Sequence, residues 1–414
     1  MSPENSTWPR LAIGRIAEPR LGGNYRNTES VSGRPLIKMG NIVRVGIDLS
    51  HIEYIPDGET VSPSHRLRYG DVLFNTRNTL DLVGKVSIWR DELPIAYYNS
   101  NILRIEFKPE YCGDSRYFGY VLNSSESIDA IRSLATGTTS VAAVYTRDLL
   151  KLRVPVPSKS EQRAIADALE DADRLVSLLE RFIAKKQAIK HGMMQQLLTG
   201  RTRLQGFGEV WEHRRVTEVG DVLAGKALNA SGSGPLRPYL RTKNVLDGRI
   251  ELEDVLYMPM TDAEFERFRL KRGDVLLNEG QSLELVGRCS IYSDEFETSC
   301  AMQNQLLRFR AHPETSPEFA AHLFRYCQRT GVFAVIATKT TSVAHLGSSR
   351  LGNLRLLWPA DRREQVAIAE VLSDMDAEIT AHEVRLDKAR ALKQGMMQQL
   401  LTGRTRLPAL ESAA

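Results

Sequence analysis

The sequence has few cysteines and no long apolar run. Its four cysteines, Cys112, Cys289, Cys300 and Cys327, form no CxxC pair and have no histidine cluster beside them. This spacing indicates neither a disulfide framework nor a zinc site, and we expect buried thiols. No apolar stretch approaches the roughly 18 to 20 residues that cross a bilayer, and the first ten residues lack the pattern of a secretory signal. We therefore expect a cytoplasmic protein without membrane contact.

Recognisable catalytic motifs are missing as well. The sequence contains no H-E-x-x-H, G-x-S-x-G or [ND]-P-P-[FYW] motif. Residues 220–227 (GDVLAGKA) nearly fit the phosphate-binding G-x-x-x-x-G-K-[ST], but Ala227 lacks the hydroxyl that would hold magnesium. Asp71 and Asp274 each follow a glycine and precede an apolar run, which is more typical of a turn than of a catalytic acid. We predict no catalytic residue, no metal site and no cofactor bound by this chain.

The net charge is small, but it is unevenly distributed. The chain has 55 basic and 51 acidic side chains, which gives +4. Residues 1–203 hold 28 basic and 23 acidic side chains, or +5, so the remainder holds 27 and 28, or −1. A basic face is typical of proteins that bind polyanions, and the first half is the better candidate for one.

An internal repeat determines the expected architecture. The segment GMMQQLLTGRTRL occurs at residues 192–204 and again at 395–407, an offset of 203. Over residues 161–204, 25 of 44 positions are identical to the second copy without a gap. Weaker similarity continues upstream, where LRYGDVLFNT matches LKRGDVLLNE. A repeat of about 200 residues is too long for a solenoid, so each copy is predicted to be a complete domain with an appendage.

Each copy has two parts. The first part contains short β-type runs and a predicted helix near residues 117–134, which is typical of an α+β domain. A long helix should then begin, because Ser158 with Glu161 and Asp361 with Glu364 have the spacing of a capping box. Gly200 and Gly403 are placed as the glycines that end these helices. The expected boundaries are 1–158 and 204–361 for the two domains, 159–203 and 362–407 for the helices, and 408–414 for a tail.

The long helices carry an apolar seam at alternating spacings of four and three, which is the pattern of a coiled coil. In the first copy the seam runs through Ile165, Leu169, Ala172, Val176, Leu179, Ile183, Lys186, Lys190, Met193 and Leu197. In the second copy it runs through Ile368, Leu372, Met375, Ile379, His382, Leu386, Ala389, Lys393, Met396 and Leu400. A rod of about 40 residues and roughly 60 Å needs a partner helix. We predict that each helix pairs with the other copy, antiparallel if a pseudo-two-fold axis relates the copies.

In its order of parts the sequence resembles the specificity subunits of Type I restriction-modification systems. The resemblance rests on two copies of a Pro-containing entry (VPVPSKSEQ, LLWPADRREQ), a long helix, a QQLLTGRTRL exit and a GDVL run in each variable part. It covers nearly the whole chain, although the entry lacks the LPPL often found in the family. The resemblance implies two target recognition domains, each reading one half of a bipartite, asymmetric site on double-stranded DNA.

The resemblance also implies partners. The conserved helices would dock two modification subunits, which carry the S-adenosylmethionine chemistry, and restriction subunits can join such an assembly. The repeated helix ends are the candidate docking residues: Met193, Met194, Gln195, Gln196, Leu197, Met396, Met397, Gln398, Gln399 and Leu400. Core packing explains their apolar positions, but the near-identity of the two segments suggests two copies of one partner.

Comparison of the two copies suggests which residues contact DNA. Where the copies agree, as at Gly84 and Gly287, we infer framework. After GDVL the copies differ and carry residue types that read bases: Asn75, Thr76, Arg77, Asn78, Asn278, Glu279 and Gln281. The two half-sites should therefore differ, with a plain solvated loop as the alternative.

Two further groups are candidates for phosphate contact. The Thr-rich segments supply Thr138, Thr139, Ser140, Thr340, Thr341 and Ser342, for which a plain turn is the alternative. The cations are Lys38, Arg44, Lys85, Arg241, Lys243 and Arg288. Two other functions stay open at this point, a coiled-coil scaffold that bridges two proteins and a stand-alone methyltransferase or nuclease with cryptic motifs.

Overall fold

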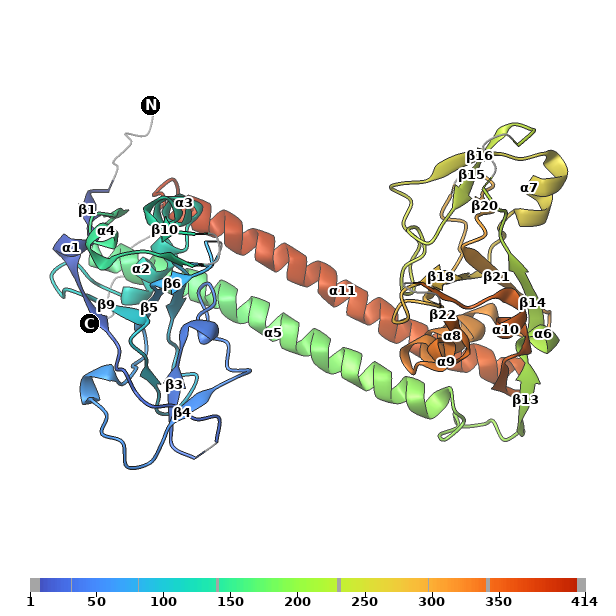
Figure 1. The fold of residues 1–414 in the computed structure, drawn as a ribbon, viewed down its shortest axis with the longest axis horizontal. Helices are drawn as coiled ribbons and strands as arrows, with labels where there is room; N and C mark the ends of the chain where they lie inside the picture. Colours follow the sequence, from blue (N-terminus) through green and yellow to red (C-terminus); the bar gives the residue numbers. More distant parts are fainter. Residues whose placement is uncertain are drawn as a thin grey trace. The chain divides into compact units, whose positions relative to one another are not determined.

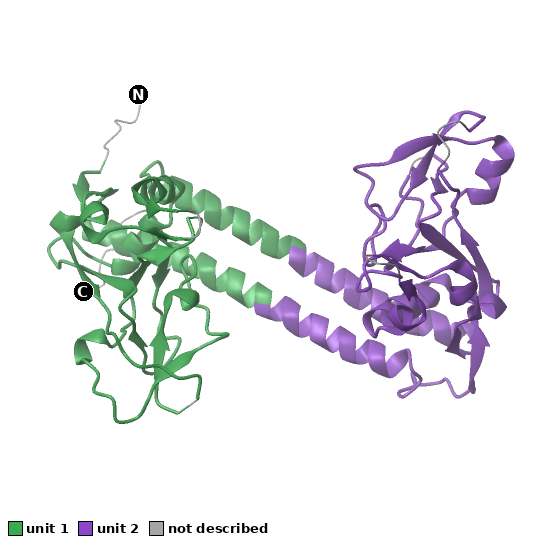
Figure 2. Cartoon of the chain, viewed as in Figure 1, with its two compact units in different colours: residues 1–180, 384–414 green, residues 181–383 purple. Residues whose placement is uncertain are grey.

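The computed structural model describes residues 8–30, 32–80, 82–138, 141–228, 232–296, 298–339 and 343–407. The chain forms two compact units. Unit 1 consists of Met1–Glu180 with Val384–Ala414, and unit 2 of Arg181–Glu383. Figure 2 shows that each long helix contributes one half to unit 1 and the other half to unit 2. Residues 1–7 and 408–414 and the short internal gaps are not described.

Unit 1 alternates short strands with short helices before its long helix. Its strands are β1 (Arg10–Ala12), β2 (Ala17–Leu21), β3 (Arg34–Ile37), β4 (Glu53–Ile55), β5 (Val72–Asn75), β6 (Arg77–Asn78), β7 (Val86–Ile88), β8 (Tyr97–Tyr98), β9 (Ile102–Phe107), β10 (Thr136–Gly137), β11 (Ala142–Ala143) and β12 (Arg153–Pro155). Its helices are α1 (Ile13–Ile16), α2 (Ser115–Leu122), α3 (Ser125–Leu134), α4 (Thr146–Leu149) and the first part of α5 (Lys159–Leu197).

Unit 2 repeats this order of strands and adds a helix, α7, before its fifth strand. Its strands are β13 (Trp211–Arg215), β14 (Gly220–Ala224), β15 (Leu236–Leu240), β16 (Leu256–Pro259), β17 (Val275–Asn278), β18 (Gly280–Gln281), β19 (Cys289–Ile291), β20 (Ala301–Met302), β21 (Leu306–Ala311), β22 (Thr338–Lys339), β23 (Ala344–His345) and β24 (Arg355–Pro359). Its helices are α6 (Val216–Val219), α7 (Asp262–Phe268), α8 (Pro317–Arg329), α9 (Val332–Ile336), α10 (Ser348–Asn353) and the first part of α11 (Arg362–Leu400).

The sheets of the two units correspond one to one. The antiparallel sheet β2-β9-β5-β7 of unit 1 matches β14-β21-β17-β19 of unit 2. The mixed sheet β4-β3-β8 matches β16-β15-β20, and the pair β1-β12 matches β13-β24. A fourth, small sheet is β10-β11-β6 in unit 1 and β18-β23-β22 in unit 2. The predicted repeat of one mixed helix-and-strand domain is thus confirmed (Figure 1).

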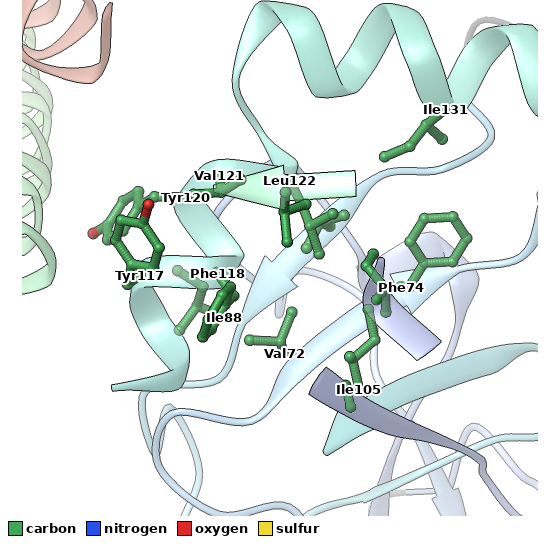
Figure 3. Close-up of a cluster of buried hydrophobic side chains, with 14 of the residues drawn as sticks. Val72, Phe74, Ile88, Ile105, Tyr117, Phe118, Tyr120, Val121, Leu122 and Ile131 are labelled. Atoms are coloured by element: carbon green, nitrogen blue, oxygen red, sulfur yellow. The ribbon is translucent and has the colours of Figure 1, made fainter. Parts of the chain in front are cut away.

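The core of unit 1 forms where α2 covers its four-stranded sheet. Side chains of β5, β7 and β9 meet Phe118 and neighbouring residues of α2 in one buried cluster (Figure 3). Gly119 allows this close approach, because a Cβ there would come within 2.5 Å of Ile88 Cγ1. In unit 2, α8 covers the equivalent sheet with Phe319 and Phe324 fully buried.

The helix predicted near residues 117–134 is wrong as a single helix. The structure has two helices, α2 and α3, because Asn123 ends the first and Ser124 caps the second. The Asn123 amide donates to the carbonyl oxygens of Val86 and Gly119, and Ser124 Oγ accepts from the Ser127 N–H at 3.3 Å. Asn and Ser favour such side-chain to backbone bonds, which interrupt helices.

The capping box predicted at the start of each long helix is complete at α5 and only half formed at α11. Before α5, the Glu161 N–H donates to Ser158 Oγ at 3.3 Å and the Ser158 N–H donates to Glu161 Oε2 at 3.1 Å, which is a capping box. Before α11, Asp361 accepts from the Arg363 N–H at 2.8 Å. The Glu364 carboxylate does not close that box, because it binds Arg203 and Trp211 instead.

Both helices end as predicted. Gly200 and Gly403 have φ of 68° and 71°, in the left-handed region that favours glycine. The Thr202 N–H then donates to the Gln196 carbonyl, and the Thr405 N–H to the Gln399 carbonyl, both at 3.2 Å.

The two long helices contact each other within each unit. Every predicted seam position is buried or half-buried. In unit 1, Asp173 pairs with Lys393 and Glu180 with Arg390, the latter at 2.7 Å. In unit 2, Lys186 pairs with Glu378 at 2.7 Å, and Lys190 pairs with Asp376. In each unit, the ion pair whose α5 residue lies later in the chain has the α11 residue that lies earlier.

Matched ion pairs attach the globular part of each unit to its helices. In unit 1, Asp173 also accepts from Arg90 Nη2 at 3.0 Å and from the Tyr120 hydroxyl at 2.7 Å. In unit 2, Asp376 also accepts from Arg325 Nη1 at 2.9 Å. Asp173 and Asp376 are equivalent in the repeat, as are Lys190 and Lys393, but the arginines come from non-equivalent positions. The helix pair is the same in both units, and each domain contacts it with its own arginine.

The described residues show neither a membrane-spanning helix nor a cluster of metal-ligating side chains. Within the described residues, no helix is both long and apolar enough to span a bilayer. The same residues contain no group of three or more histidine, cysteine or acidic side chains placed to hold a metal ion. Three of the four cysteines are buried, and Cys112 is half-buried.

The Glu364 carboxylate is fully buried. It accepts from Arg203 Nε and Nη2 at 2.5 and 2.7 Å and from Trp211 Nε1 at 3.1 Å. We expect Glu364→Ala to lower the free energy of unfolding by about 2 to 4 kcal/mol, because it leaves a largely covered guanidinium without its partner. The equivalent Glu161 lies 3.8 Å from Arg406, so Glu161→Ala should cost only about 1 kcal/mol, as for a lost cap. Urea unfolding of both variants measures this, and equal losses would contradict it.

The buried His322 should make stability depend on pH. Its pKa is lowered from 6.5 to about 4, chiefly by burial and also by the nearby charge of Arg325. The unfolded chain takes up this proton as the pH falls through 6.5, whereas the folded chain does so only near 4. Stability should therefore fall between pH 6.5 and 4, by up to about 1.4 kcal/mol per pH unit. Urea unfolding at several pH values should show a shallower slope for His322→Gln and an unchanged slope for the exposed control His191→Gln. A variant at His322 that keeps the full slope would contradict the assignment.

Candidate nucleic-acid interface

The small sheet of unit 1 joins two of the predicted DNA-contacting segments. Strand β6 pairs with β11 so that Arg77 lies opposite Ala143 and Asn78 opposite Ala142. Strand β11 pairs in turn with β10, at the start of the Thr-rich segment. Arg77 and Thr138 are exposed on this sheet or beside it. We call β6, β10 and β11 the unit 1 platform.

Unit 2 builds the same platform from β18, β22 and β23. Gly280 lies opposite His345, Gln281 opposite Ala344, and Thr338 also opposite His345. Thr338 and Lys339 are exposed, while Gln281 is half-buried. The segment after GDVL and the Thr-rich segment thus lie side by side in both units, although some 60 residues separate them in sequence.

Three residues that were predicted to contact bases instead make side-chain hydrogen bonds within their own unit. Asn75 and Asn278 are fully buried at the ends of β5 and β17. Asn75 Oδ1 accepts from the Arg77 N–H at 3.2 Å, and Asn278 Nδ2 donates to the Val245 carbonyl at 3.3 Å. The Thr76 hydroxyl donates to the Asn101 carbonyl at 2.9 Å. The prediction that these side chains reach bases is therefore corrected: Asn75 holds the turn, Asn278 connects β17 to Val245, and the hydroxyl of Thr76 is already used.

The framework predictions agree with the structure. Gly84 and Gly287 have φ of 73° and 74°, and a Cβ at either position would come within 2.2 Å of Ile131 or Phe333. Asp71 and Asp274 each accept a backbone N–H three residues earlier, from Arg68 at 2.9 Å and Lys271 at 2.7 Å. Both aspartates therefore hold turns, as their position in the sequence indicates.

His345 is a platform residue that sequence reasoning missed. Its Nδ1 lies 3.0 Å from Glu279 Oε2, and its side chain is 41% exposed. The backbone of Glu279 is held on both sides, because its N–H donates to Gln305 and its carbonyl accepts from Leu346, both at 2.8 Å. The signal was present in the aligned TTSVAA and TTSVAH segments, where Ala143 and His345 differ.

Three of the six predicted phosphate-binding cations form ion pairs within the chain. Lys38 pairs with Glu53 at 2.6 Å, and both Arg241 and Lys243 pair with Asp254 at 2.6 Å. The hydrogen bond from Lys243 and the charge of Arg241 lower the pKa of Asp254. These three cations are members of ion pairs, and their contact with phosphate stays a prediction.

The remaining cations are partly covered. Arg44, Lys85 and Arg288 are half-buried. Burial lowers the pKa of both Arg44 and Arg288, and Arg132 adds to the effect on Arg44. The predicted contacts at Thr139, Ser140, Thr340, Thr341 and Ser342 lie outside the described residues.

The predicted partner-binding segments are mostly part of the core. Met194, Leu197 and Leu400 are buried, while Met193, Met396 and Met397 pack against the same clusters. The four glutamines, Gln195, Gln196, Gln398 and Gln399, are all exposed. The apolar members are therefore packed internally, as the seam predicts, and docking of a partner at these segments stays a prediction.

Comparison with known proteins identifies the family. The model of the Type I restriction modification DNA specificity domain matches residues 18–191 and 208–389. The specificity subunit of the Type I restriction enzyme EcoKI from Escherichia coli K12 is 23% identical over 418 residues, covering 95% of this chain and 87% of that protein. The MjaVIII specificity subunit from Methanocaldococcus jannaschii is 25% identical over 326 residues, covering 75% of this chain and 74% of that protein.

Two solved structures share the fold. The S subunit of the Type I restriction-modification system from M. genitalium superimposes with a TM-score of 0.64 at 14% identity, over 97% of this chain and 98% of that one. A chain from a structure of Type I restriction-modification complex assembly gives a TM-score of 0.56 at 17% identity, over 97% of this chain and 99% of that one. Because the family model matches both copies of the repeat and most of the residues, this chain belongs to the Type I restriction-modification DNA specificity family.

Proposed function

We propose that this chain reads a bipartite, asymmetric site on double-stranded DNA, with one platform for each half-site. The observation that carries the proposal is the same three-stranded platform in both units with different polar residues on it. Unit 1 presents Arg77 and Asn78, whereas unit 2 presents Gln281 and the pair of Glu279 with His345. Arg, Asn, Gln and Glu are residue types that read base edges. Membership of the family makes the chain a non-catalytic specificity subunit.

We also propose the domain organisation that the repeat suggests. Residues 1–158 and 204–361 would be target recognition domains, and residues 159–203 and 362–407 an antiparallel coiled coil with pseudo-two-fold symmetry, followed by a tail at 408–414. The covered seam and the order of ion pairs in each unit support this arrangement. A coiled coil of this kind would set a fixed gap between the half-sites, of about one helical turn of DNA or its multiples.

The helices are the proposed docking site for two modification subunits. Besides its seam, α5 carries the exposed Leu175, Leu178 and Ile189, and Phe182, which is 38% exposed and packs one side of its ring against His382 of α11. Their spacings of three, four and seven place them on one face of the helix, and Leu178 is 59% exposed. A second apolar stripe on a helix whose first stripe is covered is suited to a partner helix.

The proposed assembly acts in the cytoplasm. The modification subunits would carry the S-adenosylmethionine, and restriction subunits would join where the system has them. The relatives that are named specificity subunits of Type I restriction enzymes support this role.

Prediction for DNA recognition. The chain, expressed with its modification subunit in a host that lacks other DNA methylation, should produce methylated adenines in one split motif. The motif should have two unlike half-sites and a fixed gap, and single-base mapping of the modified positions measures this. Arg77→Ala should relax one base of one half-site about 10- to 100-fold, because a good bidentate contact discriminates by roughly 1 to 3 kcal/mol.

The control for this experiment is Arg385→Ala, which removes the same charge from an exposed position on α11. It should leave the motif unchanged. A stable complex that methylates no split motif would contradict the proposed function, and methylation by this chain alone would contradict its non-catalytic role.

Prediction for partner docking. Leu178→Glu should weaken assembly with the modification subunit at least 10-fold, because it places a charge in the middle of the exposed apolar stripe. Size-exclusion chromatography with light scattering measures the complex, and circular dichroism checks that the variant chain is folded. Ala184→Glu adds the same charge to an exposed position on another face of α5 and should have little effect. Equal assembly by the two variants would rule out the stripe as the docking site.

A further inference from the structure

One cross-strand pair differs between the platforms in a reciprocal way. In unit 1, Arg77 on β6 lies opposite Ala143 on β11. At the equivalent place in unit 2, Gly280 on β18 lies opposite His345 on β23. Each platform therefore has one large polar residue and one small residue at this pair, but on opposite strands.

In unit 2 the large residue leaves little room for a side chain opposite it. A Cβ built on Gly280 would lie 3.3 Å from Cε1 and 3.4 Å from Nδ1 of His345, which is tighter than ordinary contacts. Directly opposed residues in antiparallel strands have neighbouring side chains, so the imidazole covers Gly280. In unit 1 the opposite residue is Ala143, and Arg77 is exposed with no side-chain hydrogen bond or ion pair to the described residues.

The two large residues offer opposite hydrogen-bonding capacity. The guanidinium of Arg77 can only donate. His345 Nδ1 lies 3.0 Å from a carboxylate oxygen of Glu279, which can only accept, so Nδ1 carries the hydrogen of this bond. In the neutral imidazole this leaves Nε2 as an acceptor. Among the described residues Nε2 has no hydrogen-bond partner.

We propose that this cross-strand pair determines one base of each half-site, and that it does so with opposite polarity. Arg77 donates to the O6 and N7 acceptors of guanine in the half-site read by unit 1. His345, held by Glu279, accepts from the amino group of adenine or cytosine in the half-site read by unit 2. The inference rests on the proposed DNA recognition and assigns a role to His345, Gly280 and Ala143.

The test transplants the unit 1 pair into unit 2. The double variant Gly280→Arg/His345→Ala, in complex with the modification subunit, should change one base of the second half-site from adenine or cytosine to guanine. The preference should shift by about 10- to 100-fold, the range of a single bidentate contact, and the first half-site should stay the same. Mapping of methylated bases at single-base resolution gives both half-sites in one experiment.

Two further variants keep the test decisive if the double variant does not fold. His345→Ala and Glu279→Gln should each reduce discrimination at that same base about 10-fold or more, without creating a preference for guanine, and thermal unfolding checks their folding. A wild-type complex with a split motif, and folded variants whose second half-site is unchanged, would overturn this inference alone. A wild-type complex without a split motif would overturn the proposed function itself.

Discussion

Each long helix has an apolar seam that it cannot bury by itself, and the rest of the structure depends on how that seam is covered. An isolated helix gains little stability in water, so a 39-residue helix of this kind needs a partner along its length. Within each unit the partner is the other long helix. Each unit also has an ion pair at the apolar contact. The buried Lys190 pairs with Asp376 in unit 2, and Lys393 pairs with Asp173 in unit 1. A polar pair in an apolar seam favours one alignment over its neighbours.

The same constraint explains why the repeat is most faithful at the helix ends. In unit 2 the end of α5 meets the start of α11, where Arg203, Glu364 and Trp211 form one cluster. In unit 1 the end of α11 meets the start of α5, where Arg406 lies over the ring of Trp8 and near Glu161. Each helix end must therefore fit the start of the other helix, and both ends face nearly the same surface. Internal fit accounts for the conserved apolar positions without a second copy of a partner.

The platforms show how a repeated domain can keep its fold while changing what it presents. Buried residues such as Asn75 and Asn278 are the same in both units, and so are the glycines that allow close packing beneath them. Their side chains are buried and make hydrogen bonds within the unit, Asn75 to Arg77 and Asn278 to Val245, so they tolerate little change. The cross-strand pair beside them, Arg77 with Ala143 in unit 1 and Gly280 with His345 in unit 2, differs at both positions. Stability and recognition are thus assigned to different residues of one short segment.

The repeat, the mixed helix-and-strand domains, the long helices with their glycine ends and the family could all be predicted from the amino-acid sequence, because they depend on local pattern and on internal identity. The sequence also placed Arg77 among the base-reading candidates. It could not show that Asn75 is buried, that Lys38 is paired with Glu53, or that His345 belongs to the platform. Burial and ion pairing depend on contacts between segments far apart in the chain, and only the tertiary structure brings those segments together.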